Sequence, residues 1–485
     1  MALSADGSRI RVAILGSGMT GCAVASTLLE SSSSTSSSFV TGTKARFDVT
    51  VYEAGRGVGG RMSTRRDDLR GGGVGGRFQF DHGCQQIVGP AKTAEFAEAL
   101  VAWRGRGCIA EWGGRFGRVF GRDDGDDEGG ERTIVFEEET GGTTTTTTTT
   151  TRYVGHPRMS SICENLVGAT ASASDGDPDP STVRVVTRTR ARAIRSSYRD
   201  GTAANTWRME RSDEDGVVEA LGIYDWVVAT DLGSARSLLP CDDDDDDDDD
   251  KENSPSFKRM IGDVDAVPIC STMVTLDGPL SSLPADGIDI DHDSHPELMG
   301  EKFGTLGWIA RDSSKPGRRW GGRGLGSDDD GREEYWILQS TRGGARVLLE
   351  RLDLMGSTLE EIREEIRRTM VNDFMRAIPL LASVTANGYR KGGTEEEDAD
   401  VLPTVIDSVG HRWGAAFPVH GKKNGDGDGN AFIRMDCHVD ATRRFVACGD
   451  YFGVHHGNVE GAFLSGRAAA NRLIRHVNTQ SNASV

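Results

Sequence analysis

A short apolar run followed by three regularly spaced glycines constrains the fold of this chain more than any other stretch. Residues 11–15 (RVAIL) suit a buried parallel strand, and Gly16, Gly18 and Gly21 follow in G-x-G-x-x-G spacing. The first glycine of such a motif allows a tight turn, the second admits a pyrophosphate to the backbone, and the third lets the next helix pack closely. We expect that helix to begin near Met19 and Thr20, where free amides and the helix dipole favour phosphate.

An acidic residue ends the second apolar strand. Residues 49–52 (VTVY) are typical of a strand, and Glu53 and Ala54 follow them. An acid in this place accepts hydrogen bonds from the adenosine ribose hydroxyls of a dinucleotide. The usual interval from the glycines is about 20 residues. Here it is longer, and residues 31–38 (SSSSTSSS) account for the excess as a loop insertion. The order of strand, glycines, helix, strand and acid predicts a dinucleotide site.

Length and composition favour two interlocked domains in a soluble enzyme. The 485 residues contain stretches too polar or repetitive to bury apolar surface. These predicted insertions are residues 31–38, 121–151, 241–257, 321–333, 391–400 and 421–430. The net charge of −19 includes nine consecutive aspartates at 242–250, and without them it is −10. This balance excludes a nucleic-acid partner, which needs a basic surface. The arginines between residues 184 and 195 are interpreted as one strand with a solvated face.

The cysteines and the N-terminus suggest a reducing compartment. Eight cysteines are scattered without a C-x-x-C pair, so no metal site is expected. Residues 1–9 are too short and polar for a signal peptide, and no apolar run is long enough to span a membrane. The cytoplasm is therefore the expected location, with an organelle left open. The oligomeric state is not indicated.

A second glycine-rich turn makes the prediction more specific. Residues 54–62 (AGRGVGGRM) follow Glu53, so Gly60, Arg61 and Met62 would approach the same pyrophosphate. The fork of an arginine side chain matches phosphate oxygens in pairs. Together the two glycine motifs resemble the FAD-binding start of the flavin-containing amine oxidase superfamily. The resemblance implies that the dinucleotide is FAD, bound without a covalent link.

The end of the chain resembles the second flavin fingerprint of that superfamily. Residues 444–450 (RFVACGD) read as a strand ending in Gly449 and Asp450, and residues 458–470 open the last helix. The resemblance implies that Asp450 accepts a hydrogen bond from the ribitol chain or orients a water at the pyrophosphate. It also implies that the helix N-terminus faces the N1–C2=O edge of the flavin. The residues at that N-terminus are Val459, Glu460, Gly461 and Ala462.

Four internal segments resemble the renalase-like branch of the superfamily. They are residues 81–85 (DHGCQ), 153–160 (YVGHPRMS), 307–318 (GWIARDSSKPGR) and 411–418 (HRWGAAFP). The first would pass the flavin ring, where its glycine allows close approach to a flat ring. His82, Gln85, Lys315 and Trp413 are candidate catalytic residues, although His82 is more often a structural histidine and Lys315 equally a surface lysine. Trp413 and Tyr451 are candidates for an aromatic wall around an amine.

These observations predict an α/β chain, α+β overall, with a Rossmann-like FAD-binding domain of three-layer ββα architecture. That domain would comprise residues 1–90, 152–240 and 430–485, with Val185 on a strand beside the cofactor. A discontinuous substrate domain, residues 91–151 and 258–429, would be built on a mixed β-sheet with flanking helices. Leu359, Ile362, Ile366, Met370 and Phe374 recur at helical spacing and predict an amphipathic helix over residues 358–378.

The resemblance implies an FAD-dependent oxidase. A small-molecule substrate would give a hydride to flavin N5, and molecular oxygen would take the electrons and yield hydrogen peroxide. The renalase-like branch favours isomers of dihydronicotinamide nucleotides, that is an NAD(P)H-type molecule, as the substrate. Oxidation of an amine, as in the wider superfamily, is the first alternative. The second is an FAD-binding sensor or scaffold without catalysis.

Overall fold

The computed structural model describes most of the chain. The described residues are 9–33, 45–66, 79–121, 132–136, 150–168, 183–195, 205–213, 216–239, 257–283, 285–290, 303–318, 333–389, 402–420 and 435–483. The sequence insertions at 321–333, 391–400 and 421–430 lie outside these ranges except for Glu333, as do most of those at 31–38, 121–151 and 241–257.

A six-stranded sheet, here called the parallel sheet, contains the first and the last strands of the chain. Its order is β10-β2-β1-β14-β21-β20. The strands are β1 (Ile10–Leu15), β2 (Phe47–Tyr52), β10 (Arg184–Val186), β14 (Trp226–Ala229), β20 (His438–Asp440) and β21 (Phe445–Ala447). Only β20 runs antiparallel to its neighbour. Because β1, β2 and β14 are buried on both faces, they read in the sequence as nearly continuous apolar runs.

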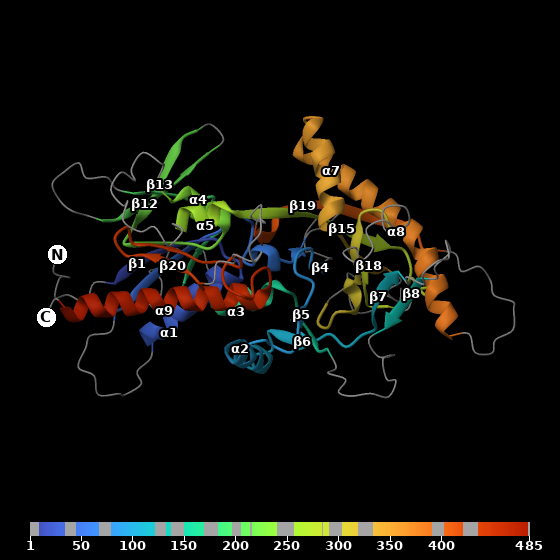
Figure 1. Cartoon of the computed structure of the whole chain (residues 1–485), viewed down its shortest axis with the longest axis horizontal. Helices are drawn as coiled ribbons and strands as arrows, with labels where there is room; N and C mark the ends of the chain where they lie inside the picture. Colours follow the sequence, from blue (N-terminus) through green and yellow to red (C-terminus); the bar gives the residue numbers. More distant parts are fainter. Residues whose placement is uncertain are drawn as a thin grey trace, which may run out of the picture.

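Helices cover one face of the parallel sheet and a small sheet covers the other. On the helical face lie α1 (Met19–Ser33), α3 (Ser160–Leu166) and α9 (Val459–Ala483), which share one apolar core with the sheet. The opposite face packs on the antiparallel strands β11 (Arg192–Arg195), β12 (Trp207–Ser212) and β13 (Val218–Tyr224). The predicted three-layer ββα architecture is therefore present (Figure 1).

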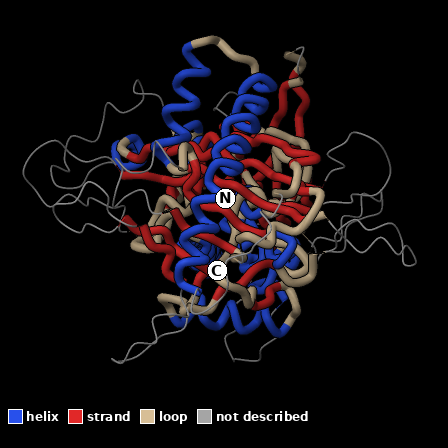
Figure 2. Tube along the Cα trace, turned by 90° about the vertical axis from the view of Figure 1, so that its right-hand side faces the viewer, coloured by secondary structure: helices blue, strands red, loops and turns tan. Residues whose placement is uncertain are grey.

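A mixed sheet of seven strands forms the other half of the molecule. Its order is β19-β15-β18-β17-β16-β7-β8, and only the pair β16–β7 is parallel. The strands are β7 (Phe116–Gly121), β8 (Arg132–Phe136), β15 (Val264–Leu276), β16 (Gly287–Ile290), β17 (Leu306–Arg311), β18 (Glu334–Ser340) and β19 (Val405–His420). Two helices, α7 (Arg342–Leu354) and α8 (Leu359–Tyr389), pack on it through a separate apolar core. Figure 2, turned so that this half faces the viewer, shows helices above the strands.

Two long strands connect the halves. Strands β15 and β19 pair antiparallel over most of their length. Val264, at the start of β15, packs in a core of the parallel sheet, whereas Val274 and Leu276 pack in the core under α7 and α8. Figure 1 shows this pair crossing from one half to the other.

Shorter elements complete the fold. They are η1 (Gly60–Met62), β3 (Arg65–Arg66), β4 (Gln79–Phe80), β5 (Ile87–Val88), α2 (Ala94–Gly105), β6 (Ile109–Glu111), β9 (Arg152–Gly155), α4 (Leu232–Ser237), α5 (Phe257–Gly262) and η4 (Asp312–Ser314). The two η elements are single 3₁₀ turns.

Four sequence expectations about local structure are wrong. Helix α1 continues through Ser33, so the serine run is helical where it begins. Helix α8 passes through Pro379 and ends at Tyr389, beyond the predicted end. The 184–195 stretch forms two strands in different sheets, because β10 pairs with β2 whereas β11 pairs with β12. Strand β8 also falls inside the predicted insertion at 121–151.

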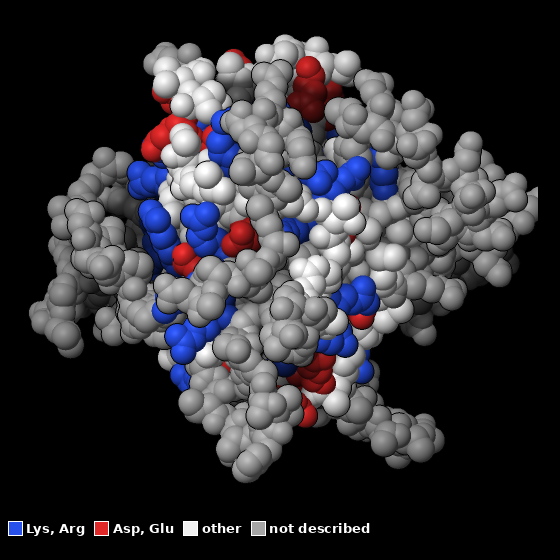
Figure 3. All heavy atoms as spheres, turned by 90° about the vertical axis from the view of Figure 1, so that its left-hand side faces the viewer, with Lys and Arg blue, Asp and Glu red and all other residues white. Residues whose placement is uncertain are grey.

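Basic side chains gather on one face of the molecule. Figure 3 shows the end that carries both termini, where Lys and Arg outnumber Asp and Glu among the coloured atoms. The arginines at positions 184, 188, 190, 192 and 195 are all exposed. Among the described helices, none is long and apolar enough to cross a bilayer.

Candidate functional site

A cavity of about 410 Å³ lies between the parallel sheet and the seven-stranded sheet. The first group of lining residues follows the carboxyl ends of parallel strands or begins a helix. It comprises Gly16, Gly18, Met19, Thr20, Glu53, Gly59, Gly60, Arg61, Met62, Thr230, Asp231, Asp450, Gly457, Asn458, Val459 and Ala462. The second group comes from residues 83–86 and from strands of the seven-stranded sheet. It comprises Gly83, Cys84, Gln85, Gln86, Ile269, Gln339, Trp413, Ala416 and Phe417. The cavity therefore occupies the place where open α/β sheets bind their ligands.

Two helix N-termini face this cavity. Helix α1 begins at Met19 and α9 at Val459, and both residues line it. Gly16 has φ +99°, and a Cβ on Gly18 would have no atom closer than the Gly59 carbonyl oxygen at 3.9 Å. The space that a side chain at Gly18 would fill is thus open to a ligand. Exposed amides and two positive helix ends make this region suited to a pyrophosphate.

Glu53 follows the carboxyl end of β2 and lines the cavity. Its Oε2 accepts hydrogen bonds from the amide of Ser17 (3.0 Å) and from the Ser17 hydroxyl (2.6 Å). Its Oε1 accepts from the Gly55 amide at 2.6 Å. These contacts fix the carboxylate in one orientation, and its remaining lone pairs suit ribose hydroxyls.

Arg61 and Asp450 meet across the cavity wall. Both guanidinium NH groups donate to the carboxylate at 2.6 Å, and one also donates to the Ala416 carbonyl at 2.7 Å. From the sequence, Arg61 is expected at the pyrophosphate and Asp450 at the ribitol chain or at a water beside the pyrophosphate. In the structure the two side chains pair with each other, and both line the cavity.

Six predicted cofactor contacts are not among the residues that line the cavity: Gly21, Ala54, Val185, Gly449, Glu460 and Gly461. Gly21 serves packing, since a Cβ there would collide with the Gly16 carbonyl oxygen. The Glu460 carboxylate accepts from the Thr93 amide and hydroxyl at 2.8 Å, and so anchors the start of α2. Val185 pairs with Val51 inside the parallel sheet.

Residues 81–86, here called the wall segment, pass between the two halves along the cavity. Other elements hold its backbone on several sides. Gln339 donates to the Gly83 carbonyl (2.6 Å), the Cys84 amide donates to the Arg61 carbonyl (2.7 Å), and Trp413 Nε1 donates to the His82 carbonyl (3.0 Å). A Cβ on Gly83 would collide with the Arg61 carbonyl oxygen. Protein packing therefore already requires the glycine that the sequence analysis assigned to a flat ring.

His82 packs in an aromatic group behind the wall segment. Its ring centroid lies 4.7 Å from that of His411 and 4.9 Å from that of Trp413. Burial, and then the charge of Arg65, lower the pKa of His82 to about 4. Burial and the neighbouring His82 lower the pKa of His411 to about 3. His82 does not line the cavity, whereas Trp413 does. Tyr451 is buried and does not line it either.

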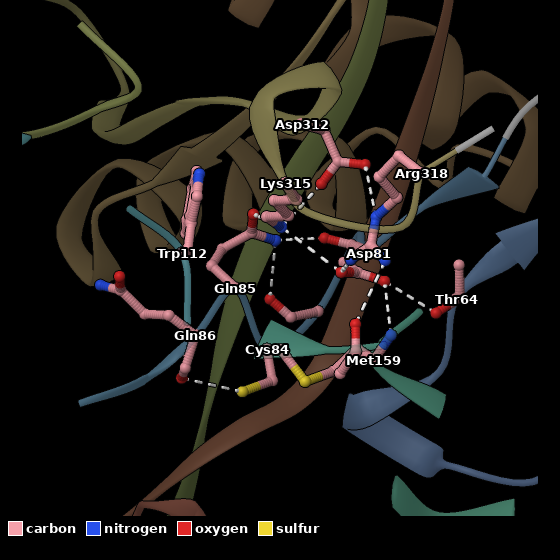
Figure 4. Close-up of polar contacts among 12 residues, drawn as sticks. Thr64, Asp81, Cys84, Gln85, Gln86, Trp112, Met159, Asp312, Lys315 and Arg318 are labelled. Atoms are coloured by element: carbon pink, nitrogen blue, oxygen red, sulfur yellow. Dashed lines mark hydrogen bonds and ion pairs between the residues drawn. The ribbon is translucent and has the colours of Figure 1, made fainter. Parts of the chain in front are cut away.

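Lys315 is buried, which excludes the surface alternative. It belongs to a cluster with Asp81, Asp312 and Arg318, whose side chains have no solvent exposure. Burial opposes the charge of Asp81, but Arg318 and Lys315 outweigh it and lower its pKa. Burial raises the pKa of Asp312 even though Lys315 lies 2.6 Å away. Figure 4 shows Lys315 between the two carboxylates and Gln85.

Several lining residues were not predicted from the sequence. Thr230 and Asp231 follow β14 as Glu53 follows β2, so the same strand-end signal was available for them. Gln339 and Ile269 lie within strands of the other half, and only tertiary structure brings them to the cavity. Among the described residues, no group of three or more His, Cys, Asp or Glu is arranged to hold a metal ion.

Comparisons with known proteins agree with this architecture. Residues 14–100 match the NAD(P)-binding Rossmann-like domain family. The whole chain is similar to the solved structure of a putrescine oxidase triple mutant redesigned for cofactor binding, with a TM-score of 0.50. That match covers 96% of this chain and 99% of the other at 11% identity. The chain thus has a Rossmann-like dinucleotide-binding region at residues 14–100, and its overall fold is that of this putrescine oxidase.

Proposed function

We propose that this protein is an FAD-dependent oxidoreductase that oxidises a small molecule in the cavity between its halves. The observation that carries the proposal is the cavity lining, which brings together the glycine-rich turn after β1, Glu53 after β2 and the N-terminus of α9. Bound there, FAD would supply hydride acceptance and electron transfer to molecular oxygen, with hydrogen peroxide as the product.

The residues of the chain would bind and orient the cofactor. The amides at Gly18 and Met19 would hold the pyrophosphate, and Glu53 would accept the ribose hydroxyls. The N-terminus of α9 at Val459 would place its positive end near the flavin ring. Each of these residues faces the open space of the cavity, and a covalent link to the chain is not required.

The cavity lining favours a substrate that presents a flat, uncharged ring, such as the dihydronicotinamide ring of a nucleotide. The carboxylates that line the cavity are those of Glu53, Asp231 and Asp450. They accept hydrogen bonds from Ser17, Ser234 and Arg61, respectively. The described lining residues from the seven-stranded sheet are Ile269, Gln339, Trp413, Ala416 and Phe417. An ammonium group would find no counter-charge among them, whereas an aromatic and amide surface suits an uncharged ring.

Amine oxidation is the second candidate. Trp413 and Phe417 both line the cavity, and aromatic faces attract cations. The described aromatic pair is therefore compatible with an amine that enters the cavity in its neutral or charged form. A non-catalytic FAD-binding protein is the third candidate. It would bind FAD through the same residues but would catalyse no reaction.

Purification and anaerobic mixing separate these proposals. We expect yellow protein that releases FAD and not FMN, and whose flavin is bleached by dihydronicotinamide isomers. Readmitted oxygen should restore the colour and produce hydrogen peroxide. Colourless protein that cannot be reconstituted with FAD would contradict the enzyme assignment. Bleaching by amines alone would contradict the dihydronicotinamide assignment, and FAD without bleaching by either class would support a binding role.

A further inference from the structure

We infer that Lys315 is a positioning residue that acts on the cavity through Gln85 and does not itself contact the ligand. The inference rests on the proposed function for the identity of that ligand, but its structural basis is independent of it. Lys315 and Gln85 come from different halves of the molecule, from the turn after β17 and from the wall segment.

The ammonium group of Lys315 is surrounded by polar partners. An ammonium group has three donors and no acceptor. Its Nζ lies 2.6 Å from Asp312 Oδ1, 3.1 Å from Gln85 Oε1 and 3.4 Å from Asp81 Oδ2. It also lies 5.1 Å from the centre of the Trp112 ring. The ammonium group thus donates hydrogen bonds to Gln85 and Asp81 and forms an ion pair with Asp312, and because the side chain is buried among these partners it does not reach into the cavity.

The contacts of the Gln85 carboxamide determine its orientation. Its oxygen accepts from Lys315, while its nitrogen donates to the carbonyl oxygens of Asp81 and of Gly83, the latter at 3.2 Å. Rotating the amide by 180° would set its NH₂ against an ammonium and its oxygen against two carbonyls. Every contact would then be repulsive. Lys315 thus selects one of the two amide orientations.

In this orientation the Gln85 carboxamide holds the backbone of the wall segment. Gln85 bonds back to the carbonyl oxygens of Asp81 and Gly83, on the N-terminal side of Cys84, and Gly83, Cys84 and Gln85 all line the cavity. Cys84 is half-buried, whereas the other described cysteines are buried. Its thiol therefore reports on whether the cavity face of the wall segment is held in place.

The cluster around Lys315 explains how such a charge is tolerated. Two carboxylates and two cations, all without solvent exposure, balance one another. Removing one partner alone would leave an uncompensated buried charge. A neutral variant must therefore lose one cation and one carboxylate together. Figure 4 shows that Arg318 faces the same carboxylates from the far side of the cluster, away from Gln85.

The test measures alkylation of Cys84 by iodoacetamide in the full chain, followed by peptide mass mapping. In Lys315→Met/Asp312→Asn the pair is lost and the cluster stays neutral. We expect Cys84 to react about tenfold faster than in the wild type, a change of the size seen when contacting residues are uncoupled. Gln85→Leu should give the same acceleration, and adding Gln85→Leu to the double variant should add little.

The matched control is Arg318→Met/Asp312→Asn. It also removes one cation and the same carboxylate, and it costs stability because Arg318 donates to the carbonyl oxygens of Gly155 and Pro157. Its Cys84 reactivity should stay near that of the wild type at a temperature where both remain folded. Equal acceleration in the control, multiplicative effects of Lys315 and Gln85, or unchanged reactivity in Gln85→Leu would each overturn the inference.

Adding FAD separates this inference from the proposed function. If FAD occupies the cavity, it should protect Cys84 from iodoacetamide in the wild type, and protection should need a higher FAD concentration in the Lys315 double variant. Absence of protection in every variant would count against FAD, while the difference in Cys84 reactivity without FAD would still establish the positioning role.

Discussion

Arg61 and Asp450 lie 389 residues apart in the chain and form a two-pronged ion pair with both N–O distances at 2.6 Å. The pair joins the second glycine-rich turn to the segment before α9. It also connects to the seven-stranded sheet through the bond from Arg61 to the Ala416 carbonyl. The two fingerprints at opposite ends of the sequence therefore contact each other directly.

Breaking this pair should destabilise the protein. We expect Arg61→Gln or Asp450→Asn to lower the free energy of unfolding by about 1–2 kcal/mol, because Arg61 is partly exposed and its pairing is only partly screened. Urea unfolding measures the change. The double variant should lose less than the sum of the single variants. Strict additivity would show that the two side chains do not stabilise each other.

Gly21→Ala should disrupt the dinucleotide cradle. The new Cβ would collide with the Gly16 carbonyl oxygen and force α1 away from β1. We expect a fall in the free energy of unfolding of roughly 1–3 kcal/mol, as in other overpacked cores, and weaker FAD binding. The matched control is Gly57→Ala, where a Cβ would meet no atom within 4 Å. Equal effects of the two substitutions would contradict the assigned packing role.

Glu53→Gln should weaken FAD binding without unfolding the protein. The substitution removes the negative charge that favours ribose hydroxyls as donors, and we expect about a tenfold rise in the dissociation constant. Titration calorimetry of the FAD-free protein measures it. Ser17→Ala removes the hydroxyl donor to the same carboxylate at 2.6 Å but keeps its charge, so its effect should be smaller.

Acid should destabilise the folded protein through His82. Its pKa is lowered to about 4 by burial in the folded protein, below the ordinary value of about 6.5. The unfolded chain therefore binds more protons between these values, and stability is lost as the pH falls through that window. We expect a loss of about 2 kcal/mol from His82 between pH 7 and pH 5, measured by urea unfolding. The loss should shrink in His82→Asn, and an unchanged pH dependence would refute this role.

The sequence predicted the parts of the site that local geometry determines. Gly16, Gly18 and Glu53 follow strands whose apolar runs are visible in the sequence, so their place at the sheet edge could be inferred. The same apolar runs predicted the Rossmann-like sheet that carries these residues. Asp231 carries an equivalent signal after β14 and was overlooked.

The remaining part of the site depends on contacts between distant residues. No local pattern shows that Arg61 would pair with Asp450, or that Glu460 would anchor α2 at Thr93. Lys315 lies before a proline in a polar segment, which resembles a surface turn. Its burial arises only when Asp81 and Asp312 meet it from two halves of the molecule.

The position of the last helix has a consequence for synthesis on the ribosome. Strand β21 pairs with β14, and Gly466 of α9 packs so closely on α1 that a Cβ would collide with the Thr20 carbonyl oxygen. The first glycine motif is made long before its covering helix α9. A nascent chain therefore exposes the apolar face of α1 until α9 has emerged, which makes that interval one in which a chaperone has much to protect.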